Sequence, residues 1–176
     1  KNMDKILDFF KDRLTQTYID RGYRYDIINA ALASGIDNII DLSKRLQTIT
    51  ELAKEDLWLD LVTVVERTFN ISKNETLSGD VDPDLLVEPE EKKLWNTFND
   101  NREKINSFIK EGNYKEASTL YRQVFSEPVH AFFDKVFVNV EDKKIKNNRL
   151  TMLKKINEIY SNNIADLSKI VVEQRK

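Results

Sequence analysis

The sequence predicts an all-α fold, and three observations support this. Only four glycines and three prolines occur in 176 residues, too few for the many tight turns of a β-sandwich or β-barrel. Apolar residues recur at three- and four-residue spacing, which is the period of a helix with one buried face. Hydrophobic residues make up 40% of the chain and charged residues 33%, as in a water-soluble globule. We therefore expect one domain over 1–176, a helical bundle of about eight or nine helices.

The first half of the chain predicts four helices, at about 4–21, 26–33, 37–54 and 57–69. The first helix carries an apolar stripe from Leu7 to Tyr18. The second is rich in alanine, which allows a neighbouring helix to approach closely. Asp37 precedes the third helix and can accept hydrogen bonds from its free amides.

The segment at about 72–88 contains an excess of acidic residues, one glycine and one proline, and its apolar periodicity disappears. It therefore predicts an exposed acidic loop. Pro89 starts the next helix well, because the first turn of a helix does not use that amide. Gly112 then suits the left-handed position that ends a helix.

The remaining helices are expected at about 89–110, 114–125, 126–139, 142–160 and 164–172. The third of these is started by Ser126 and Pro128 and carries the paired Phe132 and Phe133. Such pairs are more often core than base-stacking platforms. The fourth has an apolar side and a side rich in lysine and arginine, a pattern more often only solvated than bound to a partner.

Net charge and cysteine content limit the functional classes only weakly. The formal charge of −2 does not decide for or against nucleic acid, because binding follows local clusters of charge. The absence of cysteine excludes disulfides and thiolate zinc sites, and it fits a reducing compartment. No apolar run approaches the roughly 20 residues that cross a bilayer.

No catalytic motif is present, and we predict neither a catalytic residue nor a metal site. Asp80, Asp82, Asp84 and Glu91 have the spacing of four calcium-loop ligands. The loop also requires a glycine at its sixth position, where this chain has Leu85. The acidic residues are therefore better explained as an exposed loop.

Three longer segments are similar in sequence to one known family. They are FFKDRLTQTYIDRGYRYDIINAALA at 9–33, EPEEKKLW at 88–95 and PVHAFFDKVFVNVEDKKIKNNRLTMLKKI at 128–156, and IADLSKI at 164–170 follows them. Together they resemble the C-terminal anticodon-binding domain of the bacterial glycyl-tRNA synthetase β subunit, a helical domain similar to that of arginyl-tRNA synthetase. The resemblance extends over nearly the whole chain. Two departures are His130, where an aspartate is expected, and VERTFNI at 65–71, where a more basic run is expected.

The resemblance implies a non-catalytic fragment of a longer cytoplasmic chain that holds the anticodon arm of tRNA-Gly. The parent resembles a glycine–tRNA ligase that uses ATP and Mg²⁺ and works with an α subunit, while this domain itself needs no cofactor. Aromatic side chains can stack on unpaired bases, and cationic side chains can hold the phosphates. The candidate nucleic-acid contacts are Arg13, Arg24, Tyr25, Arg45, Arg67, Asn70, Lys146 and Arg149.

A second hypothesis belongs to a different class. The chain can instead be a helical protein–protein interaction module, in which the face around Phe132 docks a partner subunit. An enzyme that hydrolyses a substrate or uses a metal is the third and weakest possibility, because no nucleophile has an identifiable base partner.

Overall fold

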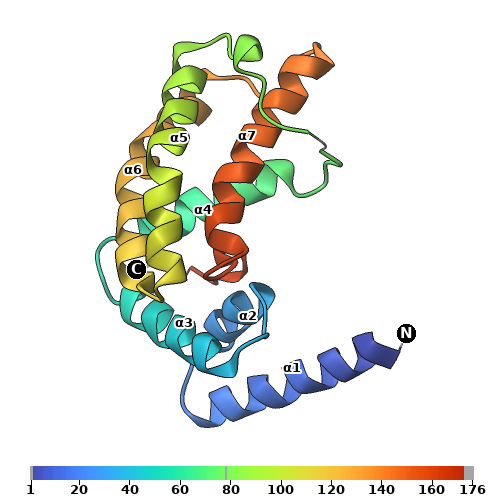
Figure 1. The fold of residues 1–176 in the computed structure, drawn as a ribbon, viewed down its shortest axis with the longest axis vertical. Helices are drawn as coiled ribbons and strands as arrows, with labels where there is room; N and C mark the ends of the chain where they lie inside the picture. The colour runs from blue at the N-terminus through green and yellow to red at the C-terminus, as the bar shows by residue number, and fades with distance from the viewer. Residues whose placement is uncertain (1, 78, 173–176) are drawn as a thin grey trace.

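The computed structural model describes residues 2–77 and 79–172, with side chains from residue 5 onward. Figure 1 shows that the described residues form helices and turns, with no strand among them. The helices are α1 (Asn2–Asp20), α2 (Tyr25–Ala33), α3 (Ile39–Leu52), α4 (Trp58–Ser72), α5 (Pro89–Lys110), α6 (Tyr114–Lys135) and α7 (Lys143–Ser161), with 3-10 turns η1 (Pro83–Leu85) and η2 (Leu167–Lys169). The predicted all-α class is confirmed, and the described part of the chain has seven α-helices in place of the expected eight or nine.

The core is built around α4, which packs against both α6 and α7. α5 and α6 form an antiparallel hairpin, and the turn between them contains Gly112 at a positive φ of 74°, as predicted. Three aromatic side chains are fully buried where α6 meets α7: Tyr121 and Phe125 of α6 and Tyr160 of α7. The ring centroid of Tyr121 lies 4.9 Å from that of Phe125 and 5.1 Å from that of Tyr160. This bundle is the main hydrophobic core of the molecule.

The predicted helix start at Pro128 is wrong, because α6 continues through this residue to Lys135. A proline inside a helix removes one hydrogen bond and costs about 3 kcal/mol. However, Phe125, Val129 and Phe132 are fully buried, and each buried side chain of this kind contributes about 1.5–3 kcal/mol. The apolar stripe thus continues past the proline without a change of phase, and its burial offsets the lost bond.

The expected closing helix at 164–172 is reduced to the single turn η2. The backbone amide of Asp166 donates to the carbonyl of Ala30 at 2.9 Å, which ties this segment to α2. The carboxylate of Asp166 accepts a hydrogen bond from the hydroxyl of Ser168 at 2.6 Å. These contacts hold the segment against α2 and α4 as an irregular strap.

Helix starts follow local chemistry. Asn38, one residue after the predicted Asp37, caps α3 by accepting from the amides of Ile40 and Asp41. At α5, Pro89 occupies the first turn and Glu91 accepts from the amide of Glu88 at 2.7 Å. The predicted use of Pro89 is confirmed.

α1 stands apart from the bundle. It packs chiefly against α2, and Figure 1 shows its N-terminal half projecting away from the other helices. The N-terminal region of the molecule, α1 to α3, therefore forms a smaller layer below the α4–α7 bundle.

Candidate nucleic-acid interface

Arg45 is buried inside the domain, and all three nitrogens of its guanidinium group donate hydrogen bonds there. Its Nε donates to Asp41 at 2.8 Å, and its two terminal nitrogens donate to the carbonyls of Ala31, Gly35 and Ile164 at 2.7, 2.8 and 3.0 Å. A buried charge needs such partners, because desolvation is otherwise very costly. Arg45 therefore joins α2, α3 and the 164–170 strap, and we leave it out of the proposed interface.

Arg149 is buried in the same way. Its side chain is 5% exposed and that of Glu91 is 0% exposed, and the Nε of Arg149 lies 2.7 Å from Oε1 of Glu91. A second nitrogen donates to Glu91 at 3.1 Å and the third to the carbonyl of Phe137 at 2.8 Å. Glu91 is at once the capping residue of α5 and the counter-ion of Arg149. Neither a phosphate contact by Arg149 nor a calcium contact by Glu91 fits this arrangement.

Two further predicted arginines lie on the surface but against aromatic rings. The guanidinium carbon of Arg67 is 4.5 Å from the ring centroid of Phe133, and that of Arg13 is 5.6 Å from the ring centroid of Phe9. A stacked guanidinium keeps its edge donors available. These two residues lie on different helices, α4 and α1, and line no common cavity.

The predicted pair Arg24 and Tyr25 is found at the start of α2. Arg24 forms an ion pair with Asp26 and donates to the carbonyl of Val171 at 3.2 Å. Burial alone would raise the pKa of Asp26, but the hydrogen bonds from Arg24 and from the amide of Val171 outweigh it and lower that pKa. Tyr25 is 62% exposed, which is unusual for a large aromatic side chain and leaves its ring available to a ligand.

The acidic loop folds back onto the basic side of α7. Glu75 pairs with Lys146 at 3.2 Å and Asp80 pairs with Lys155 at 3.1 Å. The amide side chain of Asn148 both accepts from the backbone amide of Asp82 and donates to its carbonyl, at 2.8 and 2.9 Å. The loop predicted at about 72–88 is thus held to α7 through two ion pairs and through the backbone of Asp82.

Three cavities of about 530, 230 and 160 Å³ lie next to one another on one side of the molecule. The first, between α1 and α2, shares Ala33 with the second, and the second shares Lys154 and Glu158 with the third. Because neighbouring cavities share lining residues, we treat them together as one groove that runs from α1 across the C-terminal end of α4 to the face of α7. We call it the α1–α7 groove.

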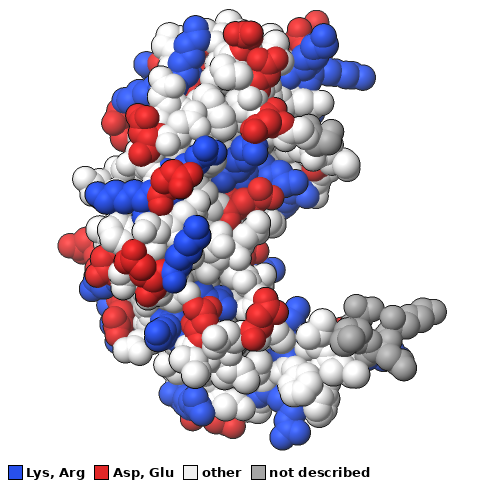
Figure 2. All heavy atoms as spheres, viewed as in Figure 1, with Lys and Arg blue, Asp and Glu red and all other residues white. Residues whose placement is uncertain are grey.

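The lysines that line the α1–α7 groove are Lys11, Lys73, Lys154, Lys155 and Lys169. Of the predicted contacts, Tyr25 lines it, Asn70 accepts from Lys73 at 3.1 Å, and Lys146 reaches it through Glu75. Acidic residues line it as well, and Figure 2 shows basic and acidic side chains interspersed around the hollow between α1 and the bundle. The groove therefore offers separate points of positive charge rather than one continuous basic surface.

None of the five groove lysines, at residues 11, 73, 154, 155 and 169, was among the contacts predicted from the sequence. Lys11 had a detectable signal, since Asp8, Lys11, Asp12 and Thr15 are spaced as one polar face of a helix. Lys169 had no such signal in the sequence, because only the tertiary fold brings η2 next to α2.

In the described residues we find no cluster of three or more potential metal ligands. None of the described helices combines the length and the hydropathy that a membrane span requires.

The helical fold agrees with comparisons to known proteins. Residues 61–168, from within α4 to η2, match the DALR anticodon binding domain family. This match covers more than half of the chain, and the chain therefore belongs to that family.

The chain also has relatives of known name. It is 36% identical over 168 residues to the glycine–tRNA ligase beta subunits of Escherichia coli O139:H28, Shigella boydii serotype 18 and Escherichia fergusonii. The matched segment is 94% of this chain and 24% of each relative. The chain thus spans about a quarter of the length of these curated relatives.

Proposed function

We propose that this chain binds the anticodon arm of tRNA-Gly as a non-catalytic domain of a glycine–tRNA ligase β subunit. The match of 61–168 to an anticodon-binding family carries the proposal. The parent protein would attach glycine with ATP and Mg²⁺, in the cytoplasm, together with an α subunit.

The α1–α7 groove supports this proposal with suitable chemistry. Its lysines can neutralise phosphates, and the exposed ring of Tyr25 can stack on an unpaired base. Arg24, Tyr25, Asn70 and Lys146 are the predicted contacts that lie in or beside the groove. Arg13 and Arg67 remain accessible on other surfaces, and we place them outside the primary contact.

Two lysines test where the RNA lies. Binding of tRNA-Gly should weaken as salt increases, with a slope of log K against log salt of about −0.7 to −0.9 per neutralised phosphate. Lys73→Ala and Lys154→Ala should each lower affinity and reduce the slope by about 1. Lys93→Ala is the matched control, because Lys93 lies on α5 outside the groove and pairs with Glu127 at 2.9 Å. Equal effects of all three changes would place the RNA elsewhere.

A competition experiment tests the specificity. Substitution of the anticodon bases should lower affinity much more than changes in the acceptor end. A chain that binds every tRNA equally, or shows no salt dependence, would contradict the proposed function.

A second function is favoured by one observation on α1. Ile6, Phe9 and Phe10 are all more than half exposed there, and exposed apolar patches commonly mark protein interfaces. The earlier hypothesis placed this interface at Phe132, which is wrong because Phe132 is fully buried. Pairing with a partner protein through α1, abolished by Phe10→Ser while tRNA binding is retained, would support this second role.

A further inference from the structure

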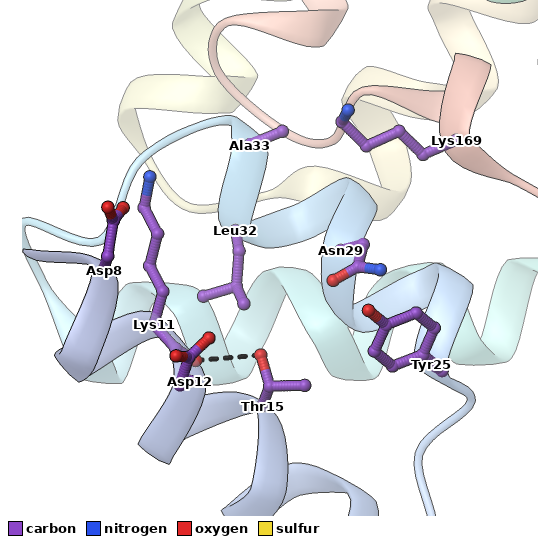
Figure 3. Close-up of a pocket in the computed structure, with 9 residues that line it drawn as sticks. All are labelled: Asp8, Lys11, Asp12, Thr15, Tyr25, Asn29, Leu32, Ala33 and Lys169. Atoms are coloured by element: carbon purple, nitrogen blue, oxygen red, sulfur yellow. Dashed lines mark hydrogen bonds between the residues drawn. The ribbon is translucent and has the colours of Figure 1, made fainter.

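The part of the α1–α7 groove between α1 and α2 has the size of a ligand site. Its volume of about 530 Å³ lies in the range of roughly 300–1,000 Å³ that is typical of small-molecule pockets. It lies outside the residues that match the anticodon-binding family, which begin at residue 61. Figure 3 shows that its walls come from three elements, α1, α2 and η2.

One wall carries an aromatic ring beside an amide. Tyr25 and Asn29 lie one turn apart on α2, and Figure 3 shows their side chains next to each other at the same end of the cavity. No hydrogen bond of the Asn29 amide is found within residues 2–77 and 79–172, so both its donors and its acceptor are available there. An aromatic face for stacking and an amide for a base edge are the two elements of single-base recognition in RNA.

The opposite wall carries carboxylates. Asp8 and Asp12 are one turn apart on α1 and face the cavity, and the hydroxyl of Thr15 donates to the carbonyl of Lys11 at 2.8 Å, so Thr15 is occupied by its own helix. A carboxylate accepts hydrogen bonds and repels acceptors. It therefore favours a base with an exocyclic amino group, such as cytosine, over uracil, which presents a carbonyl oxygen at that position.

The two lysines stand at the margins of the cavity. Lys11 extends from α1 and Lys169 from η2, and Figure 3 shows their amino groups on different sides of the space between the helices. Lys169 is 3.8 Å from Asp166, a long and weak ion pair. Both amino groups can hold backbone phosphates on either side of an inserted base.

We propose that this cavity binds a single unpaired RNA base that carries an exocyclic amino group. Tyr25 stacks on the base, Asn29 and Asp12 bind its edge, and Lys11 and Lys169 hold the neighbouring phosphates. This inference rests on the proposed function, because it assigns one base of the bound anticodon loop to a pocket outside the family-matched region. A free anion does not suit the cavity, since two carboxylates face it.

The test uses the full 176-residue chain and an RNA hairpin that reproduces the anticodon stem and loop of a glycine tRNA. Tyr25→Ala should weaken binding about 5- to 150-fold, the usual effect of losing one stacked base. Tyr25→Trp should restore most of the affinity, because the larger ring also stacks. Circular dichroism should show both variants folded, since the Tyr25 side chain is mostly outside the core.

The pocket is located by combining protein and RNA changes. Removing the base at one loop position should weaken binding to the unmodified chain and have no further effect on Tyr25→Ala. At that same position, replacing a base that carries an amino group by uracil should weaken binding to the unmodified chain. Asp12→Asn should reduce this discrimination, since an amide can donate to a carbonyl oxygen where a carboxylate cannot.

Phe9→Ala is the matched control. Phe9 is 56% exposed, close to the value for Tyr25, and lies on α1 without lining the cavity. It should leave hairpin affinity unchanged. If the unmodified chain binds the hairpin and Tyr25→Ala binds it equally well, the pocket assignment is wrong while the proposed function stands. If the unmodified chain does not bind the hairpin, the proposed function itself fails.

Discussion

α1 and α7 are both 19 residues long, but they relate to the core in opposite ways. α7 buries polar side chains together with its apolar ones, including Asn148, Arg149 and Asn157. On α1 the apolar stripe is covered only at its C-terminal end, where Tyr18 is 2% exposed, while Phe10 two turns earlier is 53% exposed.

The difference shows what each helix needs from its neighbours. On α7 every buried polar group named above has a partner: Asn157, for example, donates to the carbonyl of Val65 at 2.9 Å. Such groups are tolerated because they are satisfied, and each becomes costly when its partner is removed. On α1 the side chains of residues 5–11 are exposed, so few contacts would be lost there. Stability should therefore depend more on α7 than on α1, and the exposed part of α1 can serve binding.

The largest effect is expected at the ion pair between α5 and α7. Glu91→Ala would leave the guanidinium of Arg149 buried without a counter-ion and would also remove the cap of α5. We expect the free energy of unfolding to fall by about 3–5 kcal/mol, measured by urea denaturation.

Lys93→Ala serves as its control on the same helix. Lys93 and Glu127 form a solvent-exposed pair, and such pairs contribute at most about 1 kcal/mol. Similar losses for the two variants would mean that burial does not distinguish the two ion pairs, and the contrast between surface and interior would fail.

A smaller effect is expected from replacing one leucine by alanine on α7 and one on α1. Leu153 on α7 is fully buried, and Leu153→Ala should cost about 2–5 kcal/mol through lost burial and the cavity left behind. Leu7 on α1 is 42% exposed, so Leu7→Ala should cost less than about 1 kcal/mol. Urea midpoints of the two variants at equal protein concentration provide the comparison. A large loss for Leu7→Ala would show that α1 is covered in solution, for instance by another molecule.

Periodicity was enough to predict most of the fold. The apolar stripes of α3, α4, α5 and α7 predicted these helices to within a few residues, because one face of each is buried. The boundary errors have local causes: Asn38 caps α3 in place of Asp37, and the stripe of α6 continues through Pro128.

The candidate site was predictable only in part. Tyr25 was predicted as a contact after the family resemblance, since aromatic side chains can stack on unpaired bases, and it lines the groove. Arg45 and Arg149 were included for their charge, but a sequence does not show whether a guanidinium has buried partners. Those partners, such as Ile164 for Arg45 and Glu91 for Arg149, are distant in sequence. The groove itself depends on how α2, α4, α7 and η2 meet, which no single segment encodes.

The smallest of these effects concerns the polar contacts that hold the end of the described chain to α2. Oδ2 of Asp26 accepts from Arg24 at 2.6 Å and from the backbone amide of Val171 at 2.9 Å. The pKa of Asp26 in the folded chain is lowered from 3.8. Its contribution to stability is therefore complete above about pH 3.8 and is lost as the pH falls through the lower folded value. Asp26→Asn should cost about 1 kcal/mol at pH 7, since the pair is partly exposed and screened.

The Asp26→Asn variant also tests whether polar contacts at the surface contribute less to stability than the buried ion pair of Glu91. The difference in unfolding free energy between the unmodified chain and Asp26→Asn should shrink as the pH is lowered below 3.8, where the carboxylate becomes protonated in both states. Amide hydrogen exchange of Val171 should accelerate in the variant at pH 7, because its acceptor is weakened. Asp37→Asn is the control, since the Asp37 carboxylate has no hydrogen bond within the described residues. If Asp26→Asn cost as much as Glu91→Ala, the surface contacts at α2 would matter as much as the buried pair, and the distinction between binding region and stable bundle would be lost.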